Sequence, residues 1–219
     1  MFTVKDLVKI LFEGRGLKEF GYSVHEAIVE PFDLSARDFL AFASGDIEDT
    51  SFFEKEVKSI RTEIRRRRVN ALGNIKRAID CRIEELLYCY CLDAKSRHQK
   101  WNIPKKIRTL SIIGILAPGI LRKISYLRNQ LEHEFRMPSV EEVTDALDVA
   151  ELFLEATERL CYPITHLNKG TDLLIRLDRT EKRVILQEGM ETRFLEINAQ
   201  DDWLVIAKSL VDKRKNVMT

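Results

Sequence analysis

Apolar residues recur at helical spacing along most of the chain. The longest such pattern runs from Ser51 to about Leu92, with apolar positions three and four residues apart, and predicts a helix with one buried side. Asn70 and Gly73 are weak helix formers within it, so the pattern is compatible with one long helix or with two consecutive ones. The polar stretch from Asp93 to Asn102 is typical of a loop.

Capping residues and prolines mark the starts of further helices. A Ser or Thr followed three positions later by an acid satisfies the free N–H groups at a helix start. Pro104 suits the first turn of a helix that stops near Gly114, and Pro118 opens a helix that ends before Pro138. The predicted caps, which indicate several antiparallel helices in a bundle, are Thr3, Ser23, Ser35, Ser51 and Ser139.

The pattern changes after Pro163 to short, partly alternating apolar runs. They predict a small β-meander with strands at Leu173–Leu177, Val184–Gln187 and Thr192–Ile197, while Trp203–Val211 suits a fourth strand or a closing helix. We therefore expect a mainly α protein, a helical bundle with a small β-rich C-terminal segment. The expected parts are an N-terminal helical extension (1–34), the bundle (35–168) and the β-meander (169–219).

The amino-acid composition argues against some classes of protein, among them membrane-spanning proteins and zinc-binding proteins. Thirty-six Lys and Arg against 35 Asp and Glu give a net charge of +1, so any contact with nucleic acid must be local. No apolar run reaches membrane-spanning length, and the chain shows no leader pattern. The four cysteines form no CxxC pair, which argues against zinc and for a reducing, cytoplasmic location. We expect neither a metal nor a cofactor.

One group of residues on the helix after Pro118 suits phosphate chemistry. Arg128 is a permanent cation, Asn129 an amide and His133 a titratable base, and Asn129 and His133 share a helix face. A purely structural interpretation also fits, because Glu132 stands four residues from both Arg128 and Arg136 and would form ordinary ion pairs. Spacing alone does not separate these alternatives.

The surrounding sequence resembles a known family. LRNQLEHEF at Leu127–Phe135, preceded by APGILRKI and followed by PSVEEV, is similar to the R-N-x-x-x-H signature of the HEPN superfamily of nucleotide-binding helical domains. FLAFASGDIED at Phe39–Asp49 and VNALGNIKRAIDCRIEELL at Val69–Leu87 look like the first helices of bacterial members. The resemblance covers about Ser35 to Thr165 and leaves the β segment unexplained.

The resemblance implies a bundle of four or five helices that forms a homodimer through the motif helix. Many members are metal-independent endoribonucleases of toxin–antitoxin, phage-defence or RNA-processing systems. His133 would then act as general acid or base, Arg128 would hold the phosphate, and Asn129 would orient either group. The 2′-hydroxyl of RNA would be the nucleophile.

Some features of the chain extend or limit this hypothesis. Arg65, Arg68 and Arg136 are candidate RNA contacts, although a run of four arginines at 65–68 spreads around a helix and also fits a solvated face paired with acids such as Glu63. Members regulated by an antitoxin that modifies a tyrosine carry His-x-Tyr, whereas this chain has Phe135. The alternative function is a non-catalytic module that binds nucleotide or a partner protein.

Overall fold

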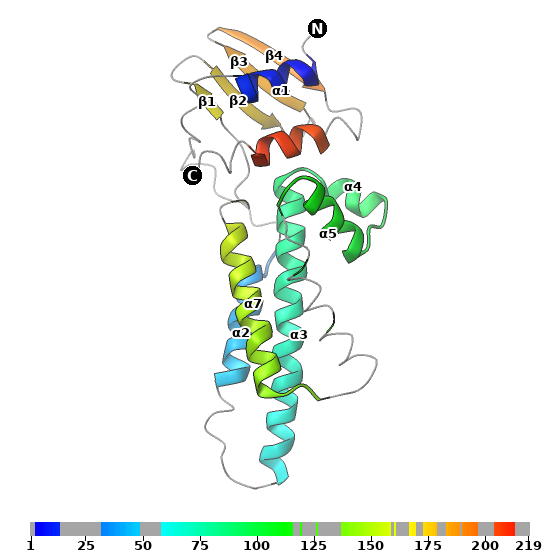
Figure 1. Ribbon diagram of the computed structural model, residues 1–219, viewed down its shortest axis with the longest axis vertical. Coiled ribbons are helices and arrows are strands. Elements are labelled where there is room, and N and C mark those ends of the chain that lie inside the picture. Colours follow the sequence, from blue (N-terminus) through cyan, green and yellow to red (C-terminus); the bar gives the residue numbers. More distant parts are fainter. Residues whose placement is uncertain are drawn as a thin grey trace. The chain divides into compact units, whose positions relative to one another are not determined.

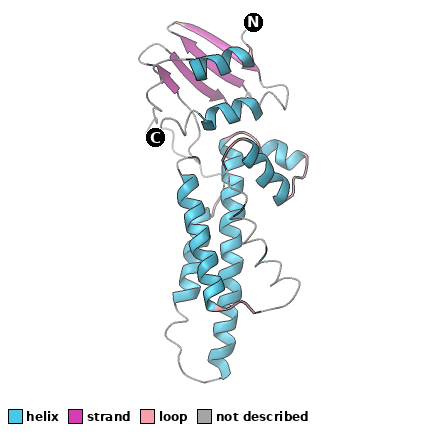
Figure 2. Ribbon diagram, viewed as in Figure 1, coloured by secondary structure: helices cyan, strands magenta, loops and turns pink. Residues whose placement is uncertain are grey.

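The computed structural model describes residues 3–13, 32–48, 58–115, 119, 126, 137–158, 160, 167–169, 173–178, 183–188, 190–196 and 204–212. Most of these residues are helical, with one small sheet near the C-terminus, as the sequence predicts (Figure 2). The chain forms two compact units, each assembled from separate stretches. The helical unit comprises Glu30–Glu85 and Ala117–Arg159, and the mixed unit comprises Met1–Val29, Leu86–Leu116 and Leu160–Thr219.

Three described helices build the helical unit: α2 (Ala36–Glu48), α3 (Lys58–Cys89), whose last turn from Leu86 belongs to the mixed unit, and α7 (Val140–Glu158). Ala36 of α2 contacts α3 at Glu85, and Asp46 contacts it at Asn74, so α2 runs antiparallel to α3. α2 also packs along α7 (Figure 1). The N-terminus of α2 thus meets the C-terminal part of α3 and the C-terminal end of α7.

α3 is continuous over its 32 residues, which settles the alternative left open by Asn70 and Gly73. An added Cβ on Gly73 would meet nothing within 4 Å, so this glycine marks neither a bend nor a close approach. The buried side chains of α3 recur three and four positions apart, as predicted, and build the core of the unit together with buried residues of α7. From α3 they include Leu72, Ile75, Ile79 and Ile83, and from α7 Val143, Leu147, Ala150 and Leu154.

The predicted helix starts are confirmed wherever they are described. Ser35 donates its backbone N–H to Asp38 at 2.8 Å, and Ser139 donates in the same way to Glu142 at 2.8 Å. Thr3 and Asp6 make the equivalent pair at the start of α1 (Val4–Glu13). The expected caps Ser23 and Ser51 lie outside the described residues.

The interpretation of Asp93–Asn102 as a loop is wrong. Residues Asp93–His98 form a short helix, α4, and Asn102 then caps α5 (Ile103–Ile112) through its side chain, with Pro104 in the first turn as predicted. Three successive helices, α3, α4 and α5, end in the same way. The chain turns at Cys91, Lys100 and Gly114, which all have positive φ, and the following residue donates its N–H back to the carbonyl five positions earlier.

The β segment is an antiparallel sheet in which each strand pairs with the next along the chain. β2 (Leu173–Asp178), β3 (Arg183–Glu188) and β4 (Glu191–Glu196) lie within one or two residues of the predicted strands, whereas β1 (Leu167–Lys169) was not predicted. Along β3, Val184 and Leu186 are buried and alternate with more exposed residues. Val184 pairs with the buried Leu195 of β4, so these residues define the covered face of the sheet.

The C-terminal stretch resolves as a helix over residues 204–212 rather than a fourth strand. Its buried residues, Ile206, Ala207, Leu210 and Val211, lie on one side at helical spacing. The expected boundary near residue 168 falls inside the mixed unit and within β1, while the three-part division of the chain stays a prediction.

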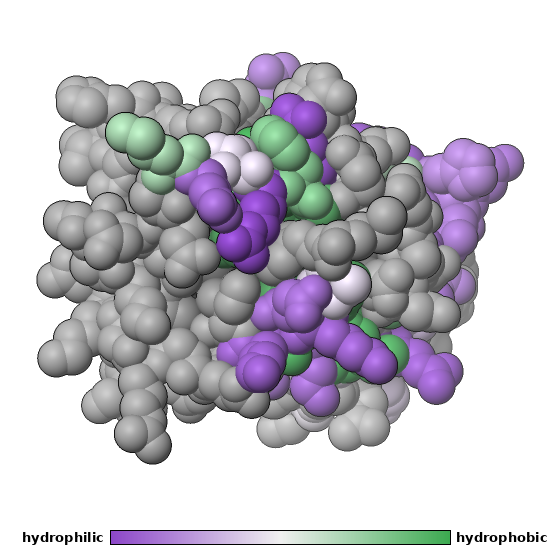
Figure 3. All heavy atoms as spheres, turned by 90° about the horizontal axis from the view of Figure 1, so that it is seen from above, coloured by the Kyte–Doolittle hydropathy of each residue, from purple (hydrophilic) through white to green (hydrophobic). Residues whose placement is uncertain are grey.

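On the face shown in Figure 3, hydrophilic side chains of the described residues lie beside hydrophobic ones. Within the described part of the chain, no helix is both long and apolar enough to cross a membrane.

Candidate functional site

The residues of the R-N-x-x-x-H sequence lie outside the described residues. This holds for Arg128, Asn129, His133 and the candidate RNA contact Arg136. In the same expected helix, Gly119 and Tyr126 are described, and both have helical backbone. Helix α7 begins shortly after the sequence motif, at the predicted cap Ser139. The assignment of the catalytic trio therefore stays a prediction.

The arginine run, Arg65 to Arg68, lies in the N-terminal part of α3. Arg66 and Arg67 both bind Glu63: the Arg66 Nη2–Glu63 Oε1 distance is 2.6 Å and the Arg67 Nε–Glu63 Oε1 distance is 2.9 Å. Arg65 is exposed and Arg68 half-buried. Arg66 and Arg67 are thus ion-paired, as the solvated-face interpretation predicts, while the positive charge of Arg68 acts on the carboxyl of Glu141 in α7.

The two guanidinium groups on Glu63 lower the pKa of its carboxyl to about 2, mainly through hydrogen bonds from Arg66 and then Arg67. A carboxyl with a lowered folded-state pKa contributes stability above its unfolded pKa and loses it as the pH falls. The window here extends from about pH 4.5 down to about 2. Because the group is at the surface, solvent screens most of this effect. At neutral pH Glu63 is a fixed negative charge that neutralises one side of α3.

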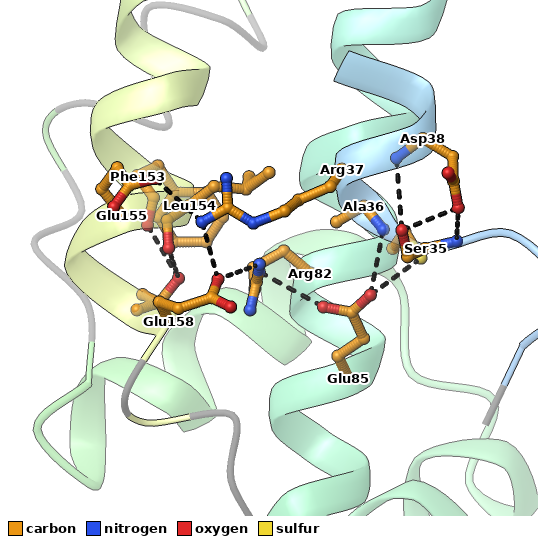
Figure 4. A network of polar contacts seen from close by, with 12 residues as sticks. Ser35, Ala36, Arg37, Asp38, Arg82, Glu85, Phe153, Leu154, Glu155 and Glu158 are labelled. Carbon is orange, nitrogen blue, oxygen red and sulfur yellow. Dashed lines mark hydrogen bonds and ion pairs between the residues drawn. The ribbon is translucent and has the colours of Figure 1, made fainter. Parts of the chain in front are cut away.

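A second polar cluster surrounds a buried arginine in the interior of the helical unit (Figure 4). Arg82 of α3 is 4% exposed. Its Nη2 lies 2.9 Å from Glu158 Oε2 of α7, and its Nε lies 3.2 Å from Glu85 Oε2, one turn further along α3. A guanidinium in this position is stabilised only because carboxylates compensate for its lost hydration.

The same carboxylates connect Arg82 to α2. Glu85 Oε1 accepts the backbone N–H of Ala36 at 3.0 Å, and thus caps the N-terminus of α2 from a distant part of the sequence. Arg37 of α2 binds Glu155 at 2.8 Å and Glu158 at 3.1 Å. The cluster therefore ties three helices together at one level of the bundle, and we assign it a structural role.

Sequence reasoning missed the Arg82 cluster. The available signal was the position of Arg82 within the buried stripe, between Ile79 and Ile83, where a charged residue requires a partner. Glu85 is the natural partner one turn away, but Glu158 is 76 residues away and no local pattern points to it. Lys76 and Asp80, four residues apart on α3, form an ion pair at 2.8 Å.

Metal and thiol chemistry find no support in the described part of the chain. No three or more described His, Cys, Asp or Glu residues gather as metal ligands. Cys81, Cys89 and Cys91 are free thiols, and Cys161 is not described. Burial, reinforced by the charge of Glu85, raises the pKa of the Cys81 thiol to about 12, so this cysteine is not a nucleophile at neutral pH.

Comparison with known proteins adds no assignment. No family model matches the chain, and neither a curated protein nor a solved structure is significantly similar to it.

Proposed function

We propose that the protein is a metal-independent endoribonuclease of the HEPN type, acting as a cytoplasmic homodimer. The observation that carries the proposal is the sequence Arg128-Asn129-Gln130-Leu131-Glu132-His133, which resembles the family signature. Two earlier segments, Phe39–Asp49 and Val69–Leu87, look like the first helices of bacterial members. A mainly helical unit containing α2, α3 and α7 supports the proposal, because the family resemblance implies a helical bundle.

In the proposed reaction the 2′-hydroxyl of the RNA attacks the adjacent phosphorus, and the bond from phosphorus to the 5′-oxygen of the next nucleotide breaks. The products are a 2′,3′-cyclic phosphate and a free 5′-hydroxyl. One His133 takes the proton of the 2′-hydroxyl, and a second His133 from the other protomer protonates the leaving oxygen. Arg128 neutralises the charge that develops on the phosphate, and Asn129 orients the imidazole or the phosphate.

The test is cleavage of a mixed RNA pool in EDTA by the wild type and by the Arg128→Ala and His133→Ala variants. Loss of the acid–base group His133 should cost about 10²- to 10⁴-fold in rate, and loss of the charge-stabilising Arg128 about 10²- to 10³-fold. Both variants should therefore cut RNA far more slowly than the wild type. Glu132→Gln is a matched control on the same segment, because it removes a charge but no proposed catalytic group. Circular dichroism must show all four proteins equally helical. The proposal is contradicted if the wild type does not cut RNA, or if the two alanine variants cut it as well as the wild type does.

The second candidate is a non-catalytic module that binds a nucleotide or a partner protein. Phe135 favours it, because the residue stands where antitoxin-regulated relatives carry a tyrosine, and so does the small net charge. This function predicts that the folded wild-type protein binds a nucleotide or a partner protein but does not cut RNA. Arg128→Ala and His133→Ala should then change the affinity for that ligand to the same extent.

A further inference from the structure

The turn that joins α4 to α5 in the mixed unit concentrates positive charge. From Lys95 to Arg108 the sequence has six lysines and arginines and neither an aspartate nor a glutamate, in a chain whose net charge is +1. Asp93, the acid just before this stretch, is paired with Arg97 at 2.8 Å. Such a local concentration of charge attracts polyanions even when the net charge does not. The six residues are Lys95, Arg97, Lys100, Lys105, Lys106 and Arg108.

Three of these cations, Lys100, Lys105 and Arg108, are exposed, and we name them the α4–α5 basic surface. Within the part of the chain that the structure describes, none of the three forms an ion pair with an acid. Nor do they belong to the buried side of α5, which is formed by Thr109 and Leu110. Their charges are therefore open to solvent and to a ligand.

Trp101 brings the three cations together. Its ring is fixed, because the residue is only 8% exposed and its Nε1 donates to Oε1 of Gln99 at 2.9 Å. Lys105 Nζ lies 5.7 Å from the centroid of this ring, and Lys100 is the residue just before it. Arg108 follows Lys105 by three positions on α5, which makes the two side chains neighbours on the helix surface. The basic surface is thus one continuous patch on a well-defined turn.

The backbone at Lys100 is an independent observation on the same patch. Lys100 ends α4 with a φ of 49°, a left-handed conformation that strains a lysine but not a glycine. Gly114, which ends α5 in the same way, shows the residue that suits this conformation. Strain of this kind is found where a side chain serves function at the expense of stability. A lysine at the tip of this turn therefore indicates that its charge is used.

We propose that the α4–α5 basic surface binds the phosphodiester backbone of RNA. Ammonium and guanidinium groups donate charged hydrogen bonds to phosphate oxygens, and each phosphate that they neutralise releases counterions. Contacts to phosphates carry no sequence information, so the surface holds RNA without regard to sequence. The choice of RNA rests on the proposed function.

The exposed side chains of the turn favour a nucleic acid over a lipid surface or a protein. From Arg97 to Arg108, all of which is described, no large apolar side chain is exposed, and Ile112 near the end of α5 is the first that is. A helix in a lipid interface needs a side with large apolar anchors. The centre of a protein–protein interface is apolar or aromatic and poor in lysine. A patch of cations without such anchors fits a ligand that is held by its charge.

The test compares Lys105→Gln/Arg108→Gln with Arg66→Gln/Arg67→Gln, a control that removes the same charge from arginines already paired with Glu63. The ligand is a single-stranded 2′-O-methyl RNA, which keeps every phosphate but lacks the nucleophile of the proposed cleavage. Fluorescence anisotropy measures its affinity at several salt concentrations. Because each contact to a single strand contributes about 0.7 to the slope of log affinity against log salt, the first variant should lose about 1.4 in slope and bind about 25-fold more weakly at 0.1 M salt. The control should stay within about threefold of the wild type.

Lys100→Gly separates binding from folding. It removes one cation and relieves the left-handed backbone, so it should weaken binding about fivefold at 0.1 M salt without any loss of stability in urea denaturation. A folding defect cannot produce this combination. Undiminished binding by Lys100→Gly would contradict the proposal.

Three other results would overturn the proposal: equal losses in the two double variants, no binding by the wild type, or tighter binding to phosphatidylserine vesicles or polyglutamate than to the RNA. The proposed function is tested separately by unmodified RNA. If the 2′-O-methyl RNA is bound as expected but unmodified RNA is not cut, the basic surface stands and the ribonuclease function fails. If unmodified RNA is cut but the 2′-O-methyl RNA is not bound, the basic surface fails and the ribonuclease function stands.

Discussion

At the scale of single residues, Cys81 shows how burial, reinforced by a neighbouring charge, controls the reactivity of a thiol. Its Sγ lies 3.5 Å from Glu85 Oε1 and from the carbonyl oxygen of Leu34, and burial raises its pKa to about 12. Only a vanishing fraction is thiolate at pH 8, so alkylation by iodoacetamide should be far slower than for an unperturbed cysteine.

Quantitative mass spectrometry of peptides from the folded, alkylated protein measures this for Cys81 directly. Glu85→Gln removes the charge that reinforces the effect of burial, and should lower the thiol pKa and accelerate the labelling. Rapid labelling of Cys81 in the wild type at pH 8, under conditions where unfolding is negligible, would contradict the assignment.

Lys100 is a second informative residue, because it ends α4 with a φ of 49°. A non-glycine residue pays about 1 kcal/mol for this left-handed conformation, which glycine adopts without strain. Lys100→Gly should therefore raise the free energy of unfolding, by at most about 1 kcal/mol because glycine also gains entropy in the unfolded chain. Urea denaturation measures it, with Lys95→Gly inside α4 as a destabilising control. A loss of stability for Lys100→Gly would contradict the prediction.

At the scale of helices and strands, the Arg82 cluster is the main polar link between α2, α3 and α7 in the described helical unit. Arg82→Met keeps much of the side-chain volume but leaves Glu85 and Glu158 without the guanidinium. We expect a loss of about 3 kcal/mol, the lower end for a broken buried pair, because Glu158 is partly exposed.

Arg37→Met is the matched control for Arg82→Met. Arg37 also binds Glu158, but from a half-exposed position, so its removal should cost less than about 1 kcal/mol. Equal costs for the two substitutions in chemical denaturation would show that burial of Arg82 does not set the strength of the cluster.

Gly73 offers a stabilising change in α3. It lies in the interior of a continuous helix, and an added Cβ would meet no atom within 4 Å. Gly73→Ala should raise the free energy of unfolding by about 0.5 to 1 kcal/mol, because alanine loses less backbone entropy in a helix. The thermal midpoint followed by circular dichroism measures the gain. A decrease would indicate that this position is packed more tightly than the geometry shows.

Local chemistry explains which elements were predictable from the sequence. α2 and α7 begin at capping boxes, and β2 to β4 alternate in hydrophobicity, so each carries its own signal. α4 has no such signal: its N-cap is Leu92 without a side-chain cap, and it ends at Lys100 instead of a glycine. The Arg97–Asp93 ion pair connects the two ends of this short helix, but a single ion pair is too weak a signal in the sequence to predict a helix.

At the scale of the whole molecule, the chain combines a helical unit and a mixed unit, each built from stretches far apart in the sequence. Residues 86–116 and 160–219 belong to one unit although a stretch of the other separates them, so neither unit is a single contiguous segment of the sequence. The candidate site was only partly predictable from the sequence. The R-N-x-x-x-H motif was predicted from a resemblance to a family, whereas the ion pairs of Arg66 and Arg67 with Glu63 became clear only from the structure.

The most direct test of the central claim examines the ends of the cut RNA. A single RNA oligonucleotide is incubated with the wild-type protein in EDTA, its cleavage position is mapped, and the same oligonucleotide is then made with one 2′-deoxy nucleotide on the 5′ side of that position. Attack by the 2′-hydroxyl predicts a 2′,3′-cyclic phosphate by mass spectrometry and no cut at the substituted position, with other positions unaffected. Cleavage that persists at the 2′-deoxy nucleotide, or a product that carries a 5′-phosphate, would contradict the account.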